Sequence, residues 1–202
     1  KRAQELENNR PQKVKVKTVE IEMDGNWKPK KTTTTFKVVT KKDSIENIEI
    51  LSSTIEEKGK VTNNTANAIK NAKDKSGRKM TFGGENIFPF TSEKRDKFLF
   101  QLKPDSVIAG KPVSVLACVS KEKQEGTFNG NYYFDKNDFT LLAFNAKPSK
   151  NPKMVKDMAL KMSFSINENG LYNIKSFDMK VHAKVLIKNF RMQVTETFND
   201  YE

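Results

Sequence analysis

MALKMSFSI, residues 158–166, decides the fold, because apolar and polar side chains alternate along it. The alternation resumes in FDMKVHAKVLI, residues 177–187, and again in FRMQVTETF, residues 190–198. A period of two is the signature of a strand with one buried face. Between the last two stretches the apolar positions change from odd to even numbers, as a tight turn or bulge near Lys188-Asn189 requires if one face stays buried. The pattern therefore predicts three long antiparallel strands.

These strands share one apolar face, and the pattern places their ionisable side chains on the opposite face. Such a face either packs a core or binds an apolar ligand, and residue chemistry leaves both interpretations open. Its methionines, which are flexible, suit a surface that accepts varied acyl chains, but they also fill ordinary cores. The candidate ligand-binding residues are Met158, Leu160, Met162, Phe164, Phe177, Met179, Val181, Phe190 and Met192.

Further strands are predicted earlier in the chain. Residues 14–23, the Asp24-Gly25 turn and residues 32–39 form a β-hairpin pattern, and residues 45–51 continue in extended form. Thr65 is placed as the N-cap of a short helix over residues 65–75. From Phe98 onwards apolar runs alternate with turns at the spacing of an antiparallel meander, over residues 98–102, 113–119, 132–134 and 139–143.

A loop rich in phenylalanine precedes the meander. Phe82, Phe88 and Phe90 lie within nine residues that have no regular period. Such side chains are unusual in a solvated loop, so we expect them to fold over an apolar surface. Two interpretations stay open, in which the loop is a lid over a ligand or a plug for the end of the core.

Chain length predicts one domain over residues 1–202. The strand patterns above make it mainly β (α+β), and residues 1–12, with their Asn-Pro cluster, are expected to be disordered or a frayed helix. The net charge of +12 and the pI near 9.6 would suit an anionic partner. The lysines, however, alternate with apolar residues, which is typical of outer strand faces and edge protection. The phenylalanines share their strand face with methionine and valine, so this face is more hydrophobic than a base-stacking platform. A nucleic-acid partner is therefore disfavoured.

No catalytic constellation emerges from the residues. His182 is the only histidine, and the single cysteine, Cys118, lies in an apolar run typical of a buried, inert thiol. Gly83-Gly84 lacks the spacing and lysine of a phosphate loop. Asp135, Asn137 and Asp138 lack the glycine and distal glutamate of a calcium loop, so they predict a turn. We therefore predict a protein that is not an enzyme, with no catalytic residues, no metal and no cofactor.

Residues 98–201 resemble the carboxy-terminal half of the bacterial outer-membrane lipoprotein-sorting family, relatives of the periplasmic lipoprotein carrier. The resemblance lies in GKPVSVL at 110–116, Gly126 and Gly130 leading to YFDKNDF at 133–139, VLIKNFR at 185–191 and FNDY at 198–201. It implies a single curved antiparallel sheet, an unclosed half-barrel around an apolar hollow, with a lid of helices and loops. The amino-terminal half departs from the family, since only residues 65–75 and 82–90 could form that lid.

The resemblance also implies a function and a location. The first hypothesis is a non-enzymatic carrier of the periplasm or cell envelope, exported with its signal peptide removed, which holds lipid or lipoprotein acyl chains on the apolar face. Its partners would be lipid or an acylated protein, with a membrane surface or an envelope protein as further candidates. The alternatives are a structural or protein-interaction module with a filled core and, third, a basic nucleic-acid-binding protein.

Overall fold

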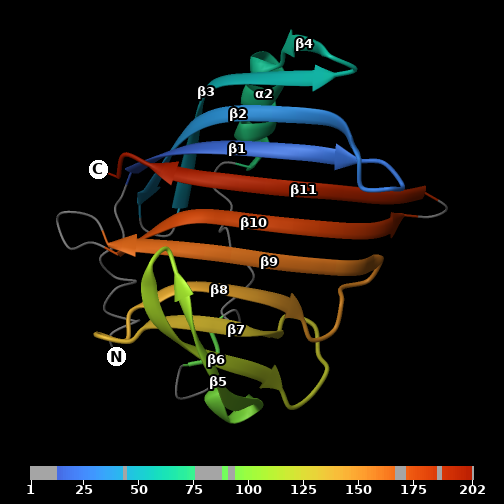
Figure 1. Ribbon diagram of the computed structural model, residues 1–202. Coiled ribbons are helices and arrows are strands. Elements are labelled where there is room, and N and C mark those ends of the chain that lie inside the picture. Colours follow the sequence, from blue (N-terminus) through green and yellow to red (C-terminus); the bar gives the residue numbers. More distant parts are fainter. Residues whose placement is uncertain are drawn as a thin grey trace.

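The chain forms one open antiparallel sheet of 11 strands in the computed structural model (Figure 1). The structure describes residues 13–42, 45–75, 88–90, 94–166, 172–185 and 188–201. One α-helix, α2 (Thr65–Lys75), and a 3-10 helix, η1 (Arg95–Lys97), accompany the sheet. The strands are β1 (Lys13–Met23), β2 (Pro29–Lys42), β3 (Ile45–Glu57), β4 (Lys60–Asn63), β5 (Phe98–Ile108), β6 (Lys111–Ser120), β7 (Phe128–Asp135), β8 (Leu141–Pro148), β9 (Val155–Ile166), β10 (Tyr172–Val185) and β11 (Lys188–Asn199).

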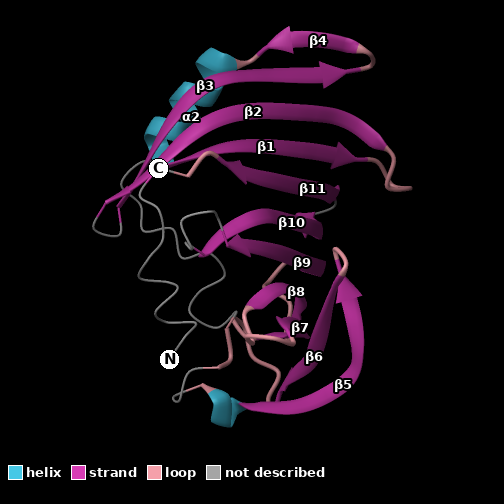
Figure 2. Ribbon diagram, turned by 60° about the vertical axis from the view of Figure 1, so that its left-hand side comes forward, coloured by secondary structure: helices cyan, strands magenta, loops and turns pink. Residues whose placement is uncertain are grey.

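The strand order is β4-β3-β2-β1-β11-β10-β9-β8-β7-β6-β5. Neighbours in the sheet are neighbours in sequence except at one place, where β1 pairs with β11 from Lys15↔Asn199 to Met23↔Arg191. The first and last strands thus join two meanders in the middle of the sheet (Figure 1). The sheet curves around the side on which α2 lies, and its end strands β4 and β5 stay apart (Figure 2). The predicted mainly β fold, with one curved and unclosed sheet, is confirmed.

The three terminal strands are confirmed as β9, β10 and β11. Phe177 pairs with Met162 on one side, and Met179 pairs with Leu160 on one side and Val194 on the other, so the apolar positions share a face. β10 ends at Val185 and β11 begins at Lys188, directly opposite it. The change of parity therefore belongs to a hairpin connection just before the predicted position. The predicted turn at residues 167–170 lies outside the described residues.

The amino-terminal hairpin is also confirmed, and Asp24 explains its turn. The Asp24 Oδ1 atom accepts hydrogen bonds from the backbone N–H groups of Asn26 and Lys28, both at 2.8 Å. These two bonds lower the pKa of the Asp24 carboxyl, because they stabilise its charged form. Trp27 takes a left-handed conformation with φ of 61°. A side-chain-bonded aspartate is the usual way to begin such a turn.

Two local predictions were wrong. Thr65 is not the N-cap, because the first helical N–H, that of Ala68, bonds to the carbonyl of Asn64, while the Thr65 hydroxyl binds the backbone of Ser53 in β3. Phe139 does not begin a strand but lies in the preceding turn with φ of 59°, exposed to solvent. The predicted turn at Asp135 and Asp138 is confirmed, since their carboxylates accept bonds from the N–H groups two residues on.

The main core lies on one face of the sheet, which we call the inner face. Its buried members come from β6 to β10 and the segments beside them, and the partly buried Phe88 and Phe90 pack against them. α2 packs on the same face at the other end, since the Lys37↔Ile50 pair carries this face from β2 to β3, where α2 lies. The core cluster consists of Cys118, Phe128, Tyr132, Leu141, Phe144, Ala146, Leu160, Met162, Phe164 and Phe177.

Candidate ligand-binding face

The predicted ligand-binding residues separate into two groups on the inner face. Leu160, Met162, Phe164 and Phe177 are buried in the core cluster, at 4–7% exposure. The others lie further along β9 and β10 and on the neighbouring β11, and they remain partly open, with Phe190 reaching 41% exposure at the β10–β11 hairpin. We call this second group the open strip. It consists of Met158, Met179, Val181, Phe190 and Met192.

Phe88 and Phe90 pack against the core cluster, as either a lid or a plug would, and Phe88 reaches Phe164 of the buried group. The Phe88 ring meets Phe144 edge to face, with centroids 5.6 Å apart. The Phe90 ring meets Tyr132 and Phe134 in the same way, at 4.9 and 5.5 Å. Such edge-to-face contacts add to the burial of the rings. The third lid candidate, Phe82, lies outside the described residues.

A row of paired residues across the inner face changes from apolar to polar at β11. On the apolar side Phe144 pairs with Met162, which pairs with Phe177. Phe177 then pairs with Glu196, and Glu196 with Thr18. The row continues through Thr35 and Ser53, whose hydroxyls lie 2.9 Å apart. Along this row the inner face is therefore apolar from β8 to β10 and polar from β11 to β3, and we call the polar stretch of the row the polar belt.

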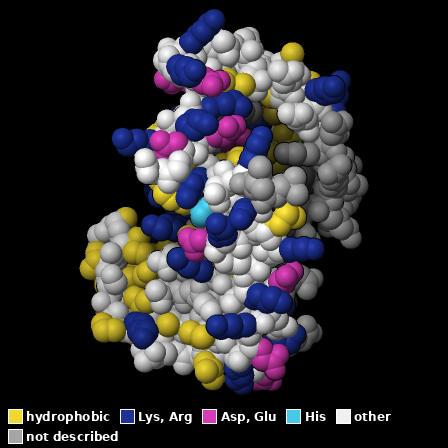
Figure 3. All heavy atoms as spheres, turned by 90° about the vertical axis from the view of Figure 1, so that its right-hand side faces the viewer, with side chains coloured by type: hydrophobic (Ala, Val, Ile, Leu, Met, Phe, Trp, Pro, Cys, Tyr) yellow, Lys and Arg dark blue, Asp and Glu magenta, His cyan; other side chains and the backbone are white. Residues whose placement is uncertain are grey.

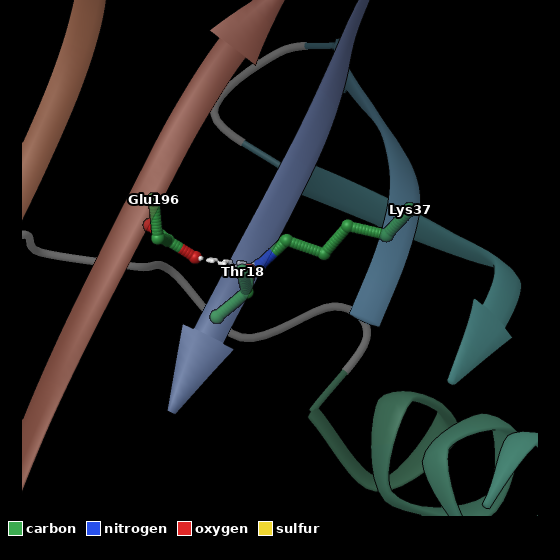
Figure 4. A network of polar contacts seen from close by, with 3 residues as sticks. All are labelled: Thr18, Lys37 and Glu196. Atoms are coloured by element: carbon green, nitrogen blue, oxygen red, sulfur yellow. Dashed lines mark hydrogen bonds and ion pairs between the residues drawn. The ribbon is translucent and has the colours of Figure 1, made fainter. Parts of the chain in front are cut away.

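The centre of the polar belt is a largely buried ion pair (Figure 4). Glu196 Oε1 accepts hydrogen bonds from Lys37 Nζ at 2.8 Å and from Thr18 Oγ1 at 2.9 Å. The side chains of Lys37 and Glu196 are only 18% and 12% exposed. The expectation that all ionisable groups of these strands face outwards is thus wrong at Glu196. Its even number matched the apolar positions of β11, so the parity pattern itself carried the signal.

A cavity of about 290 Å³ lies beside this polar belt, between α2 and β3. Ile48 and Ile50 come from the strand, and Ile69, Ala72 and Lys73 come from the helix. Lys37 pairs directly with Ile50, so the buried ion pair is one strand away from the cavity wall. The volume is just below the roughly 300 Å³ at which small-molecule sites begin. Its lining is mainly apolar, with one carboxylate, that of Glu49, and one ammonium group, that of Lys73. Sequence reasoning treated this helix only as part of a lid and missed the cavity.

The remaining reactive side chains have structural surroundings. Cys118 is fully buried, as predicted, and burial raises the pKa of its thiol to about 12. Burial also raises the pKa of Tyr132. His182 lies on the outer face, where its Nε2 atom is 3.3 Å from Asn189 Oδ1. In the part of the chain that the structure describes, no group of three or more His, Cys, Asp or Glu side chains could hold a metal ion.

Lysine and arginine side chains are spread over the side of the molecule that Figure 3 presents, at one end of the strands. Hydrophobic side chains gather instead on the lower left lobe of that view, where the β5–β6 hairpin lies (Figure 3). Among the described residues, no helix has both the length and the hydropathy needed to cross a membrane.

No protein-family model and no curated protein sequence matches this chain. Solved structures similar to it include a putative outer membrane lipoprotein-sorting protein domain from Vibrio parahaemolyticus, at 12% identity and a TM-score of 0.43, covering 98% of this chain and 88% of that one. A DUF1329 family protein from Desulfovibrio piger has 10% identity, a TM-score of 0.43 and the same coverage. A LolA superfamily protein from Nitrosomonas europaea has 10% identity and a TM-score of 0.42, covering 98% and 91%. The similarity to these three structures is limited to the path of the backbone.

Proposed function

We propose that this protein is a non-enzymatic carrier of the bacterial cell envelope, which holds an acyl chain of a lipid or lipoprotein against the inner face of its sheet. The supporting observation is the open strip, where apolar side chains on a curved sheet stay partly exposed next to a fully packed core. Apolar surface removed from water contributes about 0.8 kcal/mol per buried methylene. A chain lying along this strip would thus continue the core that Phe88 and Phe90 complete.

The cavity beside α2 supports the same proposal. It offers isoleucine side chains to hydrocarbon, and its two charged lining residues, Lys73 and Glu49, could meet the ammonium and phosphate of a zwitterionic headgroup. The Lys37–Glu196 pair separates this cavity from the open strip, and its two charges already neutralise each other, with a further hydrogen bond from Thr18 to Glu196. We therefore place acyl chains on the open strip, or in the cavity, rather than across the polar belt, where they would bury charges.

A filled interaction module is the second candidate, and the aromatic packing favours it. The ring of Phe88 packs against Phe144 and Phe164, and the ring of Phe90 packs against Tyr132. In this alternative they are permanent core residues and the protein carries no lipid. The two candidates thus differ in whether an apolar ligand can be bound without loss of the fold.

Native mass spectrometry of the purified protein, followed by lipid extraction, distinguishes the two. The carrier is expected to retain acyl species, or to take up a neutral naphthylamine probe with a fluorescence increase. Val181→Glu places a charge on the open strip and should abolish uptake. Val61→Glu, at an exposed valine of β4, is the matched control and should leave uptake unchanged. A folded protein that neither retains acyl species nor takes up the probe would exclude the carrier.

A further inference from the structure

β5 is a long edge strand whose apolar side chains are open to solvent. Leu99 is 59% exposed and Leu102 is 74% exposed, one on each face of the strand, and Phe100 beside them is partly exposed. β4, at the other end of the sheet, has only four residues. Edge strands that are long and apolar serve as templates for further strand pairing, and proteins usually shorten or charge them. The β5 edge therefore requires a physical explanation.

The hydrogen-bonding register shows which backbone groups of β5 point to the open edge. The N–H of Lys121 donates to the carbonyl of Lys97 at 2.9 Å, and the register from Phe98↔Ser120 to Lys103↔Val115 has no break. Odd-numbered residues of β5 therefore bond to β6, and the N–H and carbonyl groups of even-numbered residues point away. The N–H of Phe98 donates a hydrogen bond to the carbonyl of Arg95, so the N–H groups that remain for a partner strand are those of Phe100 and Leu102.

The open edge has a defined end. The register of β5 shifts between Lys103 and Ser106, and Pro104 in that interval has no N–H to donate. Both features are common ways of stopping further strand pairing. They are absent from Phe98 to Lys103, so only this segment accepts a partner strand. Leu99, Phe100 and Leu102 would then line that strand on both faces.

Charge decides between a second copy of this chain and another partner. In the register of greatest overlap, an antiparallel copy of β5 would set Lys97 against Lys103 of the second molecule at both ends. Like charges opposite each other destabilise strand pairs, and each molecule carries a net charge of +12. Acidic residues at those two places would instead form favourable cross-strand pairs. The edge thus fits an apolar strand with acidic ends.

We propose that residues 98–103 of β5 bind an extended segment of another protein by strand addition. This segment has apolar residues at its centre and one acidic residue at each end. Main-chain hydrogen bonds to Phe100 and Leu102 would provide affinity, and the flanking lysines would set register and specificity. This site is on the sheet edge, away from the open strip, so it does not depend on the proposed carrier function.

A seven-residue peptide, acetylated Asp-Val-Thr-Val-Thr-Val-Asp amide with a fluorescent label, matches this edge. Its valines would lie beside Phe98, Phe100 and Leu102, and its aspartates opposite Lys97 and Lys103. We expect saturable binding by fluorescence anisotropy below about 1 mM. In deuterium exchange, bound peptide should slow the amides of Phe100 and Leu102 by roughly tenfold or more. Absence of both effects would overturn the proposal.

Two variants localise the binding. Leu102→Pro removes an outward N–H and leaves the N–H groups that bond to β6, so the far-ultraviolet circular dichroism should be unchanged while peptide affinity falls at least about tenfold. The double variant Lys97→Glu with Lys103→Glu should lose the aspartate peptide and gain the same peptide with lysine ends. Equal binding by Leu102→Pro, or no exchange of preference in the double variant, would contradict strand addition. A dimer of the unmodified protein by sedimentation that Leu102→Pro abolishes would instead assign this edge to a second copy of the chain and overturn the proposed partner.

Discussion

The carboxylate of Glu196 lies in a row whose members towards β9 are apolar, and it is the residue that most limits what the inner face can hold. Removing a carboxylate from water is costly unless other groups bond to it. Lys37 and Thr18 supply two such bonds, at 2.8 and 2.9 Å. Removal of one partner leaves the other buried without compensation. The pair is therefore important for the fold even though its net contribution is small.

Glu196→Gln should destabilise the protein by roughly 3 kcal/mol, because the ammonium group of Lys37 would stay largely buried without its counter-ion. The measurement is the free energy of unfolding in urea. Asp200→Asn is the matched control, since Asp200 also pairs with a lysine, Lys15, but both side chains are more than half exposed, at 62% and 55%. That control should change stability by less than about 0.5 kcal/mol. Similar losses in the two variants would contradict the assignment.

Cys118 predicts a specific loss of stability in alkali. Burial raises the pKa of its thiol from 9.0 to about 12, so between these values the unfolded chain has lost the proton and the folded chain keeps it. Stability then falls with rising pH, by up to about 1.4 kcal/mol per pH unit. Urea titrations at pH 9 and 10.5 should show about 2 kcal/mol more loss for the natural protein than for Cys118→Ala. Equal losses of stability in the two proteins would show that the thiol of Cys118 has the same pKa in the folded and the unfolded chain.

At the scale of elements, a variant in the segment with Phe88 and Phe90 shows whether that segment is a lid or a plug. Phe90→Ala removes the ring contacts with Tyr132 and Phe134. If the segment is a lid, the variant should stay folded, lose roughly 2 kcal/mol of stability and take up more apolar probe than the natural protein. If it is a plug, stability should fall with no gain in binding to the folded state. Probe titration and urea unfolding of the same samples measure both quantities.

The matched control for this segment is Phe139→Ala. Phe139 is an exposed phenylalanine in the β7–β8 turn, outside the core cluster. Its truncation should leave the free energy of unfolding within about 0.5 kcal/mol of the natural value. The uptake of the probe should be unchanged. A control variant that gained probe binding would show that the probe reports general exposure of the chain and not the inner face.

Elements with a strong local pattern could be predicted from the sequence, and those set by tertiary contacts could not. β9, β10 and β11 follow from period-two alternation, and the β1–β2 turn follows from Asp24 and Gly25. Thr65 was misassigned because a threonine before an alanine-rich run satisfies the N-cap preference, whereas Asn64 is the cap and Thr65 bonds to β3. No local signal distinguishes a hydroxyl that caps its own helix from one that binds another strand.

On the scale of the whole molecule, the pairing of β1 with β11 was beyond prediction from one sequence. Its partners, such as Lys15 and Asn199, are far apart in the chain, and a strand edge has no side-chain signature that specifies its partner. The same pairing brings Glu196 beside Thr18 and within reach of Lys37, so the polar belt was hidden with it. The nine predicted ligand-binding residues were placed on one face, but which of them would be covered depends on these distant contacts.

This central pairing leads to a last prediction, that residues 13–201 unfold as one unit. Because β1 and β11 pair without a break from Lys15↔Asn199 to Met23↔Arg191, the two meanders share a continuous interface in mid-sheet. Trp27, the only tryptophan, reports on the β1–β2 end, and the buried thiol of Cys118 reports on β6. Tryptophan fluorescence and thiol labelling should give the same urea midpoint and the same m-value, as two-state behaviour requires. Midpoints that differ reproducibly would instead divide the chain into two domains, with the boundary at β11.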